Sequence, residues 1–147
     1  MQTIYPYIHI IHLLLAIAFL GYIFADLAII SSLKNRFETK TQQEINKLLG
    51  ARTFKIFPLS LLFLVLTGGM MMSQYINSSA GIFETSLQKV LLFKIALVSI
   101  IVAGVLYNLF TKFTGRKKIK FMQNDFHKLV IVLGILIVIS AKIMFIV

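Results

Sequence analysis

The segment YIHIIHLLLAIAFLGYIFADLAII, residues 7–30, decides the fold class. Its 24 residues are almost wholly apolar, yet they include His9, His12 and Asp26. As an α-helix the segment would extend roughly 36 Å, enough to cross the ~30 Å hydrocarbon core of a bilayer. It therefore predicts a transmembrane helix, and its two histidines and its aspartate need a reason to be there, because ionisable groups are costly in lipid.

Three more apolar runs follow in the 147-residue chain. The four runs together cover residues 4–30, 54–75, 87–110 and 126–147. The chain is 59% hydrophobic, its mean hydropathy is +0.90, and its charges gather between the runs. Only helices satisfy this much backbone in lipid at these lengths. We therefore expect an all-α fold, in which residues 1–147 form one integral membrane domain, a four-transmembrane-helix bundle.

Positive charge is distributed unequally among the connectors. Residues 31–53 and residues 111–125 each carry five Lys or Arg, whereas the connector between the second and third runs carries none. The positive-inside rule then places the two basic connectors in the cytoplasm and both termini on the periplasmic side of a bacterial inner membrane. The net charge of +10 lies beside the spans, which favours anionic lipid headgroups as the partner and argues against nucleic acid.

The first basic connector contains a helix-start signal. Thr41 followed by Glu44 matches a capping box, so we expect a short cytoplasmic helix that leads into the second span. Gly50 is the expected break in that helix. Pro58 lacks a backbone donor and is expected to tilt the start of the span.

Polar residues recur at helical spacing in three of the runs. A spacing of three and four residues places them on one stripe of each helix. The stripes are His9, His12, Ala16, Phe19, Ile23 and Asp26 in the first run, Lys94, Val98, Ile101, Val105 and Asn108 in the third, and Lys128, Ile131, Ile135, Val138 and Lys142 in the fourth. We expect the stripes to face the interior of the bundle, as ionisable groups in a bilayer usually do.

The outer half of the predicted bundle gathers imidazole and thioether groups. With this topology it contains His9, His12, the triplet Met70, Met71 and Met72, and Met144. These groups suit copper, especially Cu(I), and also haem iron. The two histidines are three residues apart and can converge on one ion. They cannot both be axial ligands of one haem, because axial ligands approach from opposite faces.

Two lysines and two inner polar residues complete the candidate set. Lys94, about 10 Å below the outer start of its span, and Lys142, near the outer end of the fourth, are placed to meet haem propionates or another anionic ligand. Asp26 and Asn108 belong to the inner half. His127 lies there too, about a bilayer thickness, ~30 Å, from the outer histidines, so it cannot share their metal. The chain has no cysteine, which excludes thiolate ligands and disulfides.

Structural roles compete with each functional one. A histidine near a membrane interface often only hydrogen-bonds among the headgroups, and methionines often only pack. Lys142 can extend to the surface. Asp26 can pair with Lys34 or Arg52 of the basic connector.

Three stretches resemble the copper resistance protein D (CopD) group. YIHIIHLLLAIAFLGYIFAD resembles its first span, in which a histidine precedes small or aromatic residues and a glycine. LFLVLTGGMMM resembles its Leu-Thr-Gly, and LLFKIALVSIIVAGVLYNLF resembles its Lys-led helix that ends near an Asn. HemJ-type membrane protoporphyrinogen oxidases share the four-helix plan, the early histidine and the span-three lysine. The resemblance implies that His12 (or His9) and Lys94 are the functional positions.

Three hypotheses follow. The first is a CopD-like bacterial inner-membrane protein that binds copper or haem b in its outer half and takes part in copper handling or transport. The second is a HemJ-like protein that binds haem b and oxidises protoporphyrinogen IX. It ranks lower, because FADLAIISSLKNRF lacks the expected Pro-Arg and following His, and MQNDFHKLV lacks the expected Asn-Glu-x-Pro. The third is a non-catalytic accessory subunit of a larger membrane complex. The protein partners expected are a second copy of the chain, in a homo-oligomer, or the subunits of a larger membrane complex.

Overall fold

The computed structural model describes residues 3–73, 85–143 and 146, and over these ranges the chain is helical apart from short turns, with no β-strand. Four helical stretches are long and apolar enough to cross a membrane: Tyr5–Lys34, Thr39–Met72, Ser86–Thr114 and Phe126–Ile143. The prediction of an all-α protein with four membrane-length helices is confirmed. The chain has the build of a multi-pass membrane protein.

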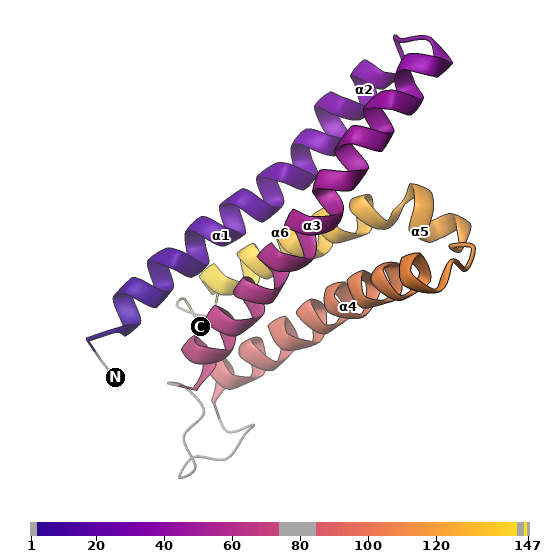
Figure 1. Cartoon of the computed structure of the whole chain (residues 1–147). Coiled ribbons are helices and arrows are strands. Elements are labelled where there is room, and N and C mark those ends of the chain that lie inside the picture. Colours follow the sequence, from indigo (N-terminus) through magenta and orange to yellow (C-terminus); the bar gives the residue numbers. More distant parts are fainter. Residues whose placement is uncertain (1–2, 74–84, 144–145, 147) are drawn as a thin grey trace. The chain divides into compact units, whose positions relative to one another are not determined.

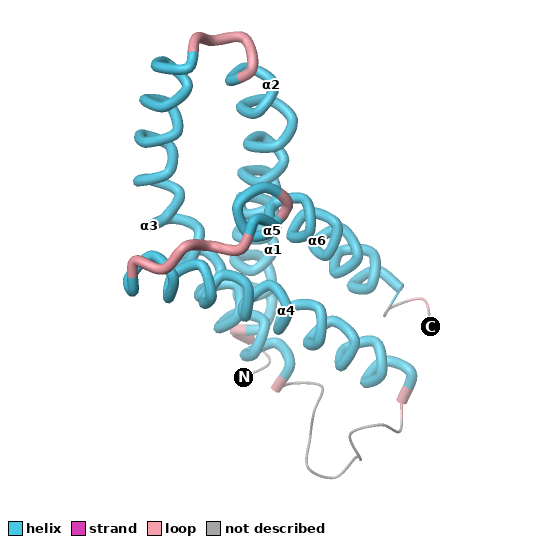
Figure 2. Tube along the Cα trace, turned by 90° about the vertical axis from the view of Figure 1, so that its right-hand side faces the viewer, coloured by secondary structure: helices cyan, strands magenta, loops and turns pink. Residues whose placement is uncertain are grey.

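The chain divides into two compact units, Met1–Met71 and Met72–Val147. Each unit is built around a pair of antiparallel helices. Both pairs can be followed in Figure 1 and Figure 2. We call the pair in the first unit the first hairpin and the pair in the second unit the second hairpin.

The first hairpin begins with one long helical stretch. It consists of α1 (Tyr5–Ala25), a π-helical segment η1 (Asp26–Ile30) and α2 (Ser31–Lys34). A turn over residues 35–38 leads into α3 (Thr39–Met72). Many large apolar side chains of both α1 and α3 remain exposed, as expected of helices that contact lipid.

The start of α3 differs from the predicted start. The helix begins at Thr39 and not after Thr41, and the side-chain amide of Gln42 in its first turn donates to the carbonyl of Phe37 at 2.8 Å. It also runs unbroken through Gly50. A single glycine costs a helix only about 1 kcal/mol relative to alanine, and the neighbouring Leu, Ala and Arg are good helix formers. Most of the connector 31–53 is therefore helical, and Pro58 lies inside α3.

The second hairpin has well-defined helix ends. Its helices are α4 (Ser86–Thr114), the short α5 (Lys120–Asn124) and α6 (Phe126–Ile143). The hydroxyl of Thr85 accepts from the N–H of Gln88 at 3.2 Å, and the side-chain oxygen of Gln88 accepts from the N–H of Thr85 at 3.3 Å, which makes a capping box. Gly115 closes α4 in the left-handed region, with φ of 68°, a conformation that favours glycine.

Two of the three predicted stripes lie on buried faces. Phe19 and Ile23 are buried on α1, and Ile101 and Val105 are buried on α4. The remaining members of these two stripes are half-buried, with the exception of His9, which is exposed. Over these residues, the first and third stripes lie on the buried faces of their own helices.

The stripe predicted for the fourth span is wrong. Lys128, Ile135, Val138 and Lys142 are exposed and Ile131 is half-buried. The buried residues of α6 are Phe126, Val130, Leu133, Gly134 and Ser140. Lysines at the ends of a span extend toward the headgroups and so mark its surface, whereas small residues such as glycine and serine mark a face where helices approach closely.

Candidate functional site

His12 joins the two helices of the first hairpin. Its Nδ1 lies 2.7 Å from Oγ1 of Thr67 on α3. The hydroxyl of Thr67 in turn lies 2.7 Å from the carbonyl oxygen of Phe63, one turn earlier in α3. A carbonyl oxygen can only accept, so the single hydroxyl hydrogen of Thr67 is used there. Thr67 therefore accepts from His12, and Nδ1 of His12 carries a proton.

This hydrogen bond fixes the tautomer of His12. When the ring is neutral and Nδ1 is protonated, the lone pair of the imidazole is on Nε2. Histidines that bind metals have this same arrangement: one ring N–H is donated to a nearby acceptor, and the other nitrogen coordinates the metal. The donor also holds the plane of the ring. His12 is thus oriented as a ligand, by a residue on a different helix.

Gly68 provides the space for the His12 ring. A Cβ at this position would lie 3.3 Å from Cε1 and 3.9 Å from Nδ1 of His12. The next residue, Gly69, has nothing within 4 Å of the corresponding point. Thr67 and Gly68 therefore form one contact surface for the imidazole, the first by hydrogen bonding and the second by having no side chain.

A similar contact lies nearer the turn of the same hairpin. The hydroxyl of Tyr22 is hydrogen-bonded to Oγ1 of Thr53 on α3, and Thr53 donates to the carbonyl of Leu49 at 2.7 Å. Between the two threonines, the rings of Phe19 and Phe57 stack with centroids 4.7 Å apart and planes 29° apart. The partners of successive α1 residues move backwards along α3, as required of an antiparallel pair.

His9 has a different environment from His12. It is exposed, and its ring lies edge-on to that of Tyr5, with centroids 6.1 Å apart. It lies one turn nearer the N-terminus, about 4.5 Å along the axis. Of the two predicted imidazole ligands, only His12 is thus held between the helices.

The three methionines at the end of α3 also differ among themselves. Met70 is 53% exposed, whereas Met71 and Met72 are half-buried. Met71 follows Thr67 by four residues and Met72 follows Gly68 by four. Helical spacing therefore places these two thioethers on the side of α3 that meets His12, one turn further toward the helix end. Met144 falls outside the described residues.

The donor set near His12 is small and soft. Among the residues that the structure describes, no group of three or more His, Cys, Asp or Glu side chains is placed to hold a metal ion. Zinc sites use three or four such ligands. One imidazole with nearby thioethers instead suits Cu(I), or haem iron with an axial histidine.

The other predicted site residues lie elsewhere. Asp26 is the first residue of η1, and it follows His12 along the same helix by fourteen residues, about 21 Å. Lys94 is half-buried on α4 and Lys142 is exposed on α6. Asn108, also on α4, has a buried Oδ1 without a hydrogen-bond partner in the described part of the chain. Asp26 and His12 therefore do not share a ligand, and the other three belong to the second unit.

The connector before α6 contains a local ion pair. Lys128 lies 2.9 Å from Oδ1 of Asp125, and both side chains are largely exposed. Burial, and then the positive charge of Lys112, lower the pKa of Lys118. Such surface pairs contribute little stability.

Sequence reasoning did not identify the partners of His12 and Tyr22. Thr67 and Gly68 were recognised only as part of the resemblance to Leu-Thr-Gly, and Thr53 was not singled out. The sequence feature that could have indicated them is a hydroxyl residue within an apolar run. Its hydroxyl can donate to a backbone carbonyl of its own helix and still accept a hydrogen bond from a neighbouring helix.

Comparisons of this chain with protein-family models, with curated proteins and with solved structures find no match. What the site can do chemically therefore follows from its own donors. These are an imidazole of fixed tautomer and, one turn away, thioether sulfurs.

Proposed function

We propose that this chain is a CopD-like membrane protein that binds copper through Nε2 of His12 in the outer half of its first hairpin. The single observation that supports this function is the donation from His12 Nδ1 to Thr67 at 2.7 Å. It places the lone pair on Nε2 and holds the plane of the ring. A ligand whose orientation is fixed in advance loses less freedom on binding.

Sulfur from α3 supplies the soft part of the proposed site. Met71 and Met72 share the side of α3 that carries Thr67 and Gly68, and both are half-buried. Thioether ligands select Cu(I) over harder ions. The imidazole and the thioethers are neutral ligands, so they would not neutralise the positive charge of a bound copper ion. The bound ion could then be passed on or could attract an anionic partner.

The proposed topology follows from the charge distribution. The connectors 31–53 and 111–125 hold ten Lys and Arg, five in each, and are assigned to the cytoplasm. His12 and the end of α3 then face the periplasmic side of a bacterial inner membrane. This is the side from which copper would reach the site.

Haem is the alternative ligand that the same observation favours. A haem-ligating histidine also coordinates through one nitrogen while the other N–H is held by an acceptor. A HemJ-like protein would use His12 in this way. An absorption spectrum of the purified protein distinguishes the two, because haem gives an intense Soret band and Cu(I) does not.

The test is copper binding by the purified protein in detergent. We expect one Cu(I) per chain, measured by elemental analysis after reduction and by competition with a chromogenic chelator. His12→Ala should lose the bound copper. His127→Ala, which removes an imidazole from the second unit, should keep it.

A second pair of variants tests the geometry without removing a ligand. Gly68→Ala places a methyl group against Cε1 of His12 and should weaken binding about ten-fold, the lower end of what loss of ligand orientation costs. Gly69→Ala adds the same methyl group in open space and should bind as the unaltered protein does. Full occupancy in His12→Ala, or equal affinities for the two glycine variants, would overturn the proposal. A Soret band that disappears in His12→Ala would replace copper by haem.

A further inference from the structure

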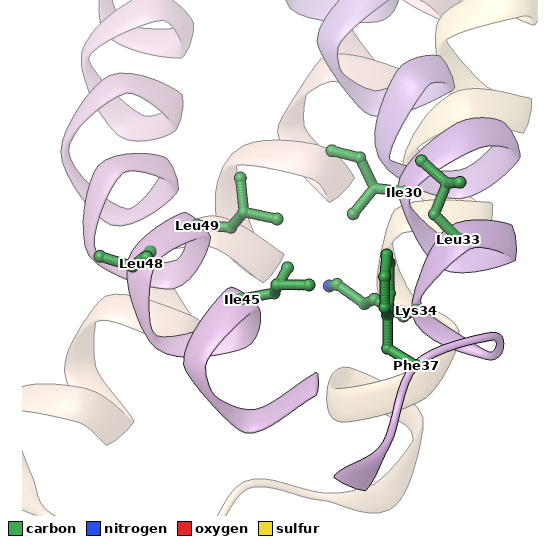
Figure 3. A pocket seen from close by; sticks show the side chains of 7 residues that line it. All are labelled: Ile30, Leu33, Lys34, Phe37, Ile45, Leu48 and Leu49. Atoms are coloured by element: carbon green, nitrogen blue, oxygen red, sulfur yellow. The ribbon is translucent and has the colours of Figure 1, made fainter. Parts of the chain in front are cut away.

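An apolar groove of about 340 Å³ lies at the turn end of the first hairpin. Figure 3 shows it between the end of the first helical stretch and the start of α3. Its walls are formed by Ile30, Leu33 and Phe37 on one side and by Ile45, Leu48 and Leu49 on the other. Its volume falls within the ~300–1,000 Å³ of ordinary ligand pockets.

The spans predicted from the sequence place the groove at the edge of the membrane. Ile30 is the last residue of the first apolar run, and Leu48 lies six residues, about 9 Å, before the start of the second. Leu33 and Leu48 are nonetheless 50% and 71% exposed. The walls are thus apolar surface at headgroup depth, continuous at Ile30 with the hydrocarbon region.

Among the described residues that line the groove, only Lys34 is charged. Figure 3 shows its aliphatic stem running into the groove, with the nitrogen directed toward α3. Its ammonium group has no carboxylate partner in the described part of the chain. Residues 30–52 around the groove hold five Lys or Arg against two Glu, so the local field attracts an anion.

We propose that this groove binds one anionic phospholipid, with an acyl chain against the apolar walls and the phosphate at Lys34. The occupant enters from the bilayer, which explains why an apolar surface is retained at this depth. Basic pockets between membrane helices bind anionic headgroups by the same physics. A second copy of this chain is disfavoured, because each copy carries a net charge of +10. The lipid site lies at the opposite end of α1 from His12 and does not depend on the copper proposal.

Because the chain contains no tryptophan, Leu48→Trp introduces a single fluorescent reporter into the groove. The variant is reconstituted in phosphatidylcholine vesicles that contain increasing fractions of brominated phosphatidylglycerol, or of brominated phosphatidylcholine in a matched series. Bromine quenches tryptophan only on close approach. We expect half-maximal quenching at about a five-fold lower fraction of the anionic lipid, the preference that one lysine near a charged lipid confers.

Two charge variants in the Leu48→Trp background separate a site from general attraction. Lys34→Gln should abolish the preference. Lys47→Gln removes the same charge from an exposed position of α3 outside the groove lining and should leave most of it. Equal quenching by both lipids, equal effects of the two charge variants, or no quenching by either lipid would each overturn the proposal. The last outcome would indicate that protein covers the groove.

Discussion

Both hairpins have strongly apolar spans but are held together differently. The first hairpin has a hydrogen bond near each end of its contact, His12 to Thr67 and Tyr22 to Thr53, with stacked rings between them. The second has a buried apolar face on each helix, and the ring of Phe126 lies against Gly104. Apolar side chains gain little by leaving lipid for one another, so a membrane hairpin needs either polar contacts or close packing.

The two kinds of contact also suit different roles for the two hairpins. A hydrogen bond between membrane helices contributes only ~0.6 kcal/mol on average, so two such contacts make a modest clamp that can be adjusted by a ligand. Close packing of apolar side chains provides no hydrogen bond that a ligand could replace. The copper proposal accordingly belongs to the first hairpin, and the second is expected to be the more rigid unit.

The largest effect is expected at Gly104. A Cβ there would lie 2.3 Å from Cε2 and 2.8 Å from Cζ of Phe126, and Phe126 is only 3% exposed. Gly104→Ala should therefore lower the free energy of unfolding by about 1–3 kcal/mol, the usual range for overpacking. The measurement is an unfolding titration in mixed micelles, followed by circular dichroism.

Two comparisons check that this loss comes from packing. Gly21→Ala, in the first hairpin, adds a methyl group where nothing lies within 4 Å, and should be neutral or stabilising because alanine is the better helix former. The smaller side chain of Phe126→Leu should restore part of the stability when combined with Gly104→Ala. Equal effects of the two glycine variants, or simple additivity in the double variant, would contradict close packing as the basis of the second hairpin.

The next effect is expected at Thr67. Thr67→Val preserves the shape but removes the acceptor for His12 Nδ1, and should cost about 1 kcal/mol of unfolding free energy. It should also release the tautomer, so that the ¹⁵N spectrum of the His12 imidazole changes from an Nδ1-protonated ring toward a mixture. The spectrum is assigned in a background where His9 and His127 are replaced by glutamine.

Thr67→Ser provides the matched control, because it retains the hydroxyl and loses one methyl group. It should keep the Nδ1-protonated spectrum and most of the stability. If the serine and valine variants behave alike, then the hydroxyl does not hold His12, and the first hairpin is packed in the same way as the second.

Sequence reasoning predicted the buried face correctly where polar or charged residues mark both ends of one stripe of a helix. On α1, charged and polar groups occur at both ends of the stripe from His12 to Asp26, which marked the face that carries Phe19 and Ile23. On α6 the lysines were taken as the same kind of marker, although Lys142 is exposed near the end of the span. On α6 the small residues Gly134 and Ser140, both buried, were the better guide, because small residues mark the face where helices approach closely.

The partner of a polar group is harder to predict than its face. The spacing within α1 placed His12 on the correct stripe, but its acceptor lies 55 residues away on another helix. Three hydroxyl residues occur on α3 beyond its first turns, at Thr53, Ser60 and Thr67, and their spacing alone does not select among them. The register of the hairpin decides, and it is set by the turn over residues 35–38 and the stacking of Phe19 on Phe57, which are tertiary features.

The smallest effect is expected at Asn108, the polar member of the α4 stripe. Its Oδ1 is buried without a partner in the described part of the chain, and the hydrogen bond from Thr111 reaches its backbone carbonyl, which a substitution leaves in place. Asn108→Leu keeps the branching at Cγ and should be neutral or stabilise the second hairpin by up to about 1 kcal/mol, since an unpaired buried oxygen contributes no favourable bond. Asn108→Ala, measured in the same unfolding titration, shows how much of any change comes from volume alone. If the leucine variant loses as much stability as Thr67→Val does, then Asn108 makes a polar contact that holds its helix, and the contrast between a hydrogen-bonded first hairpin and a packed second one fails.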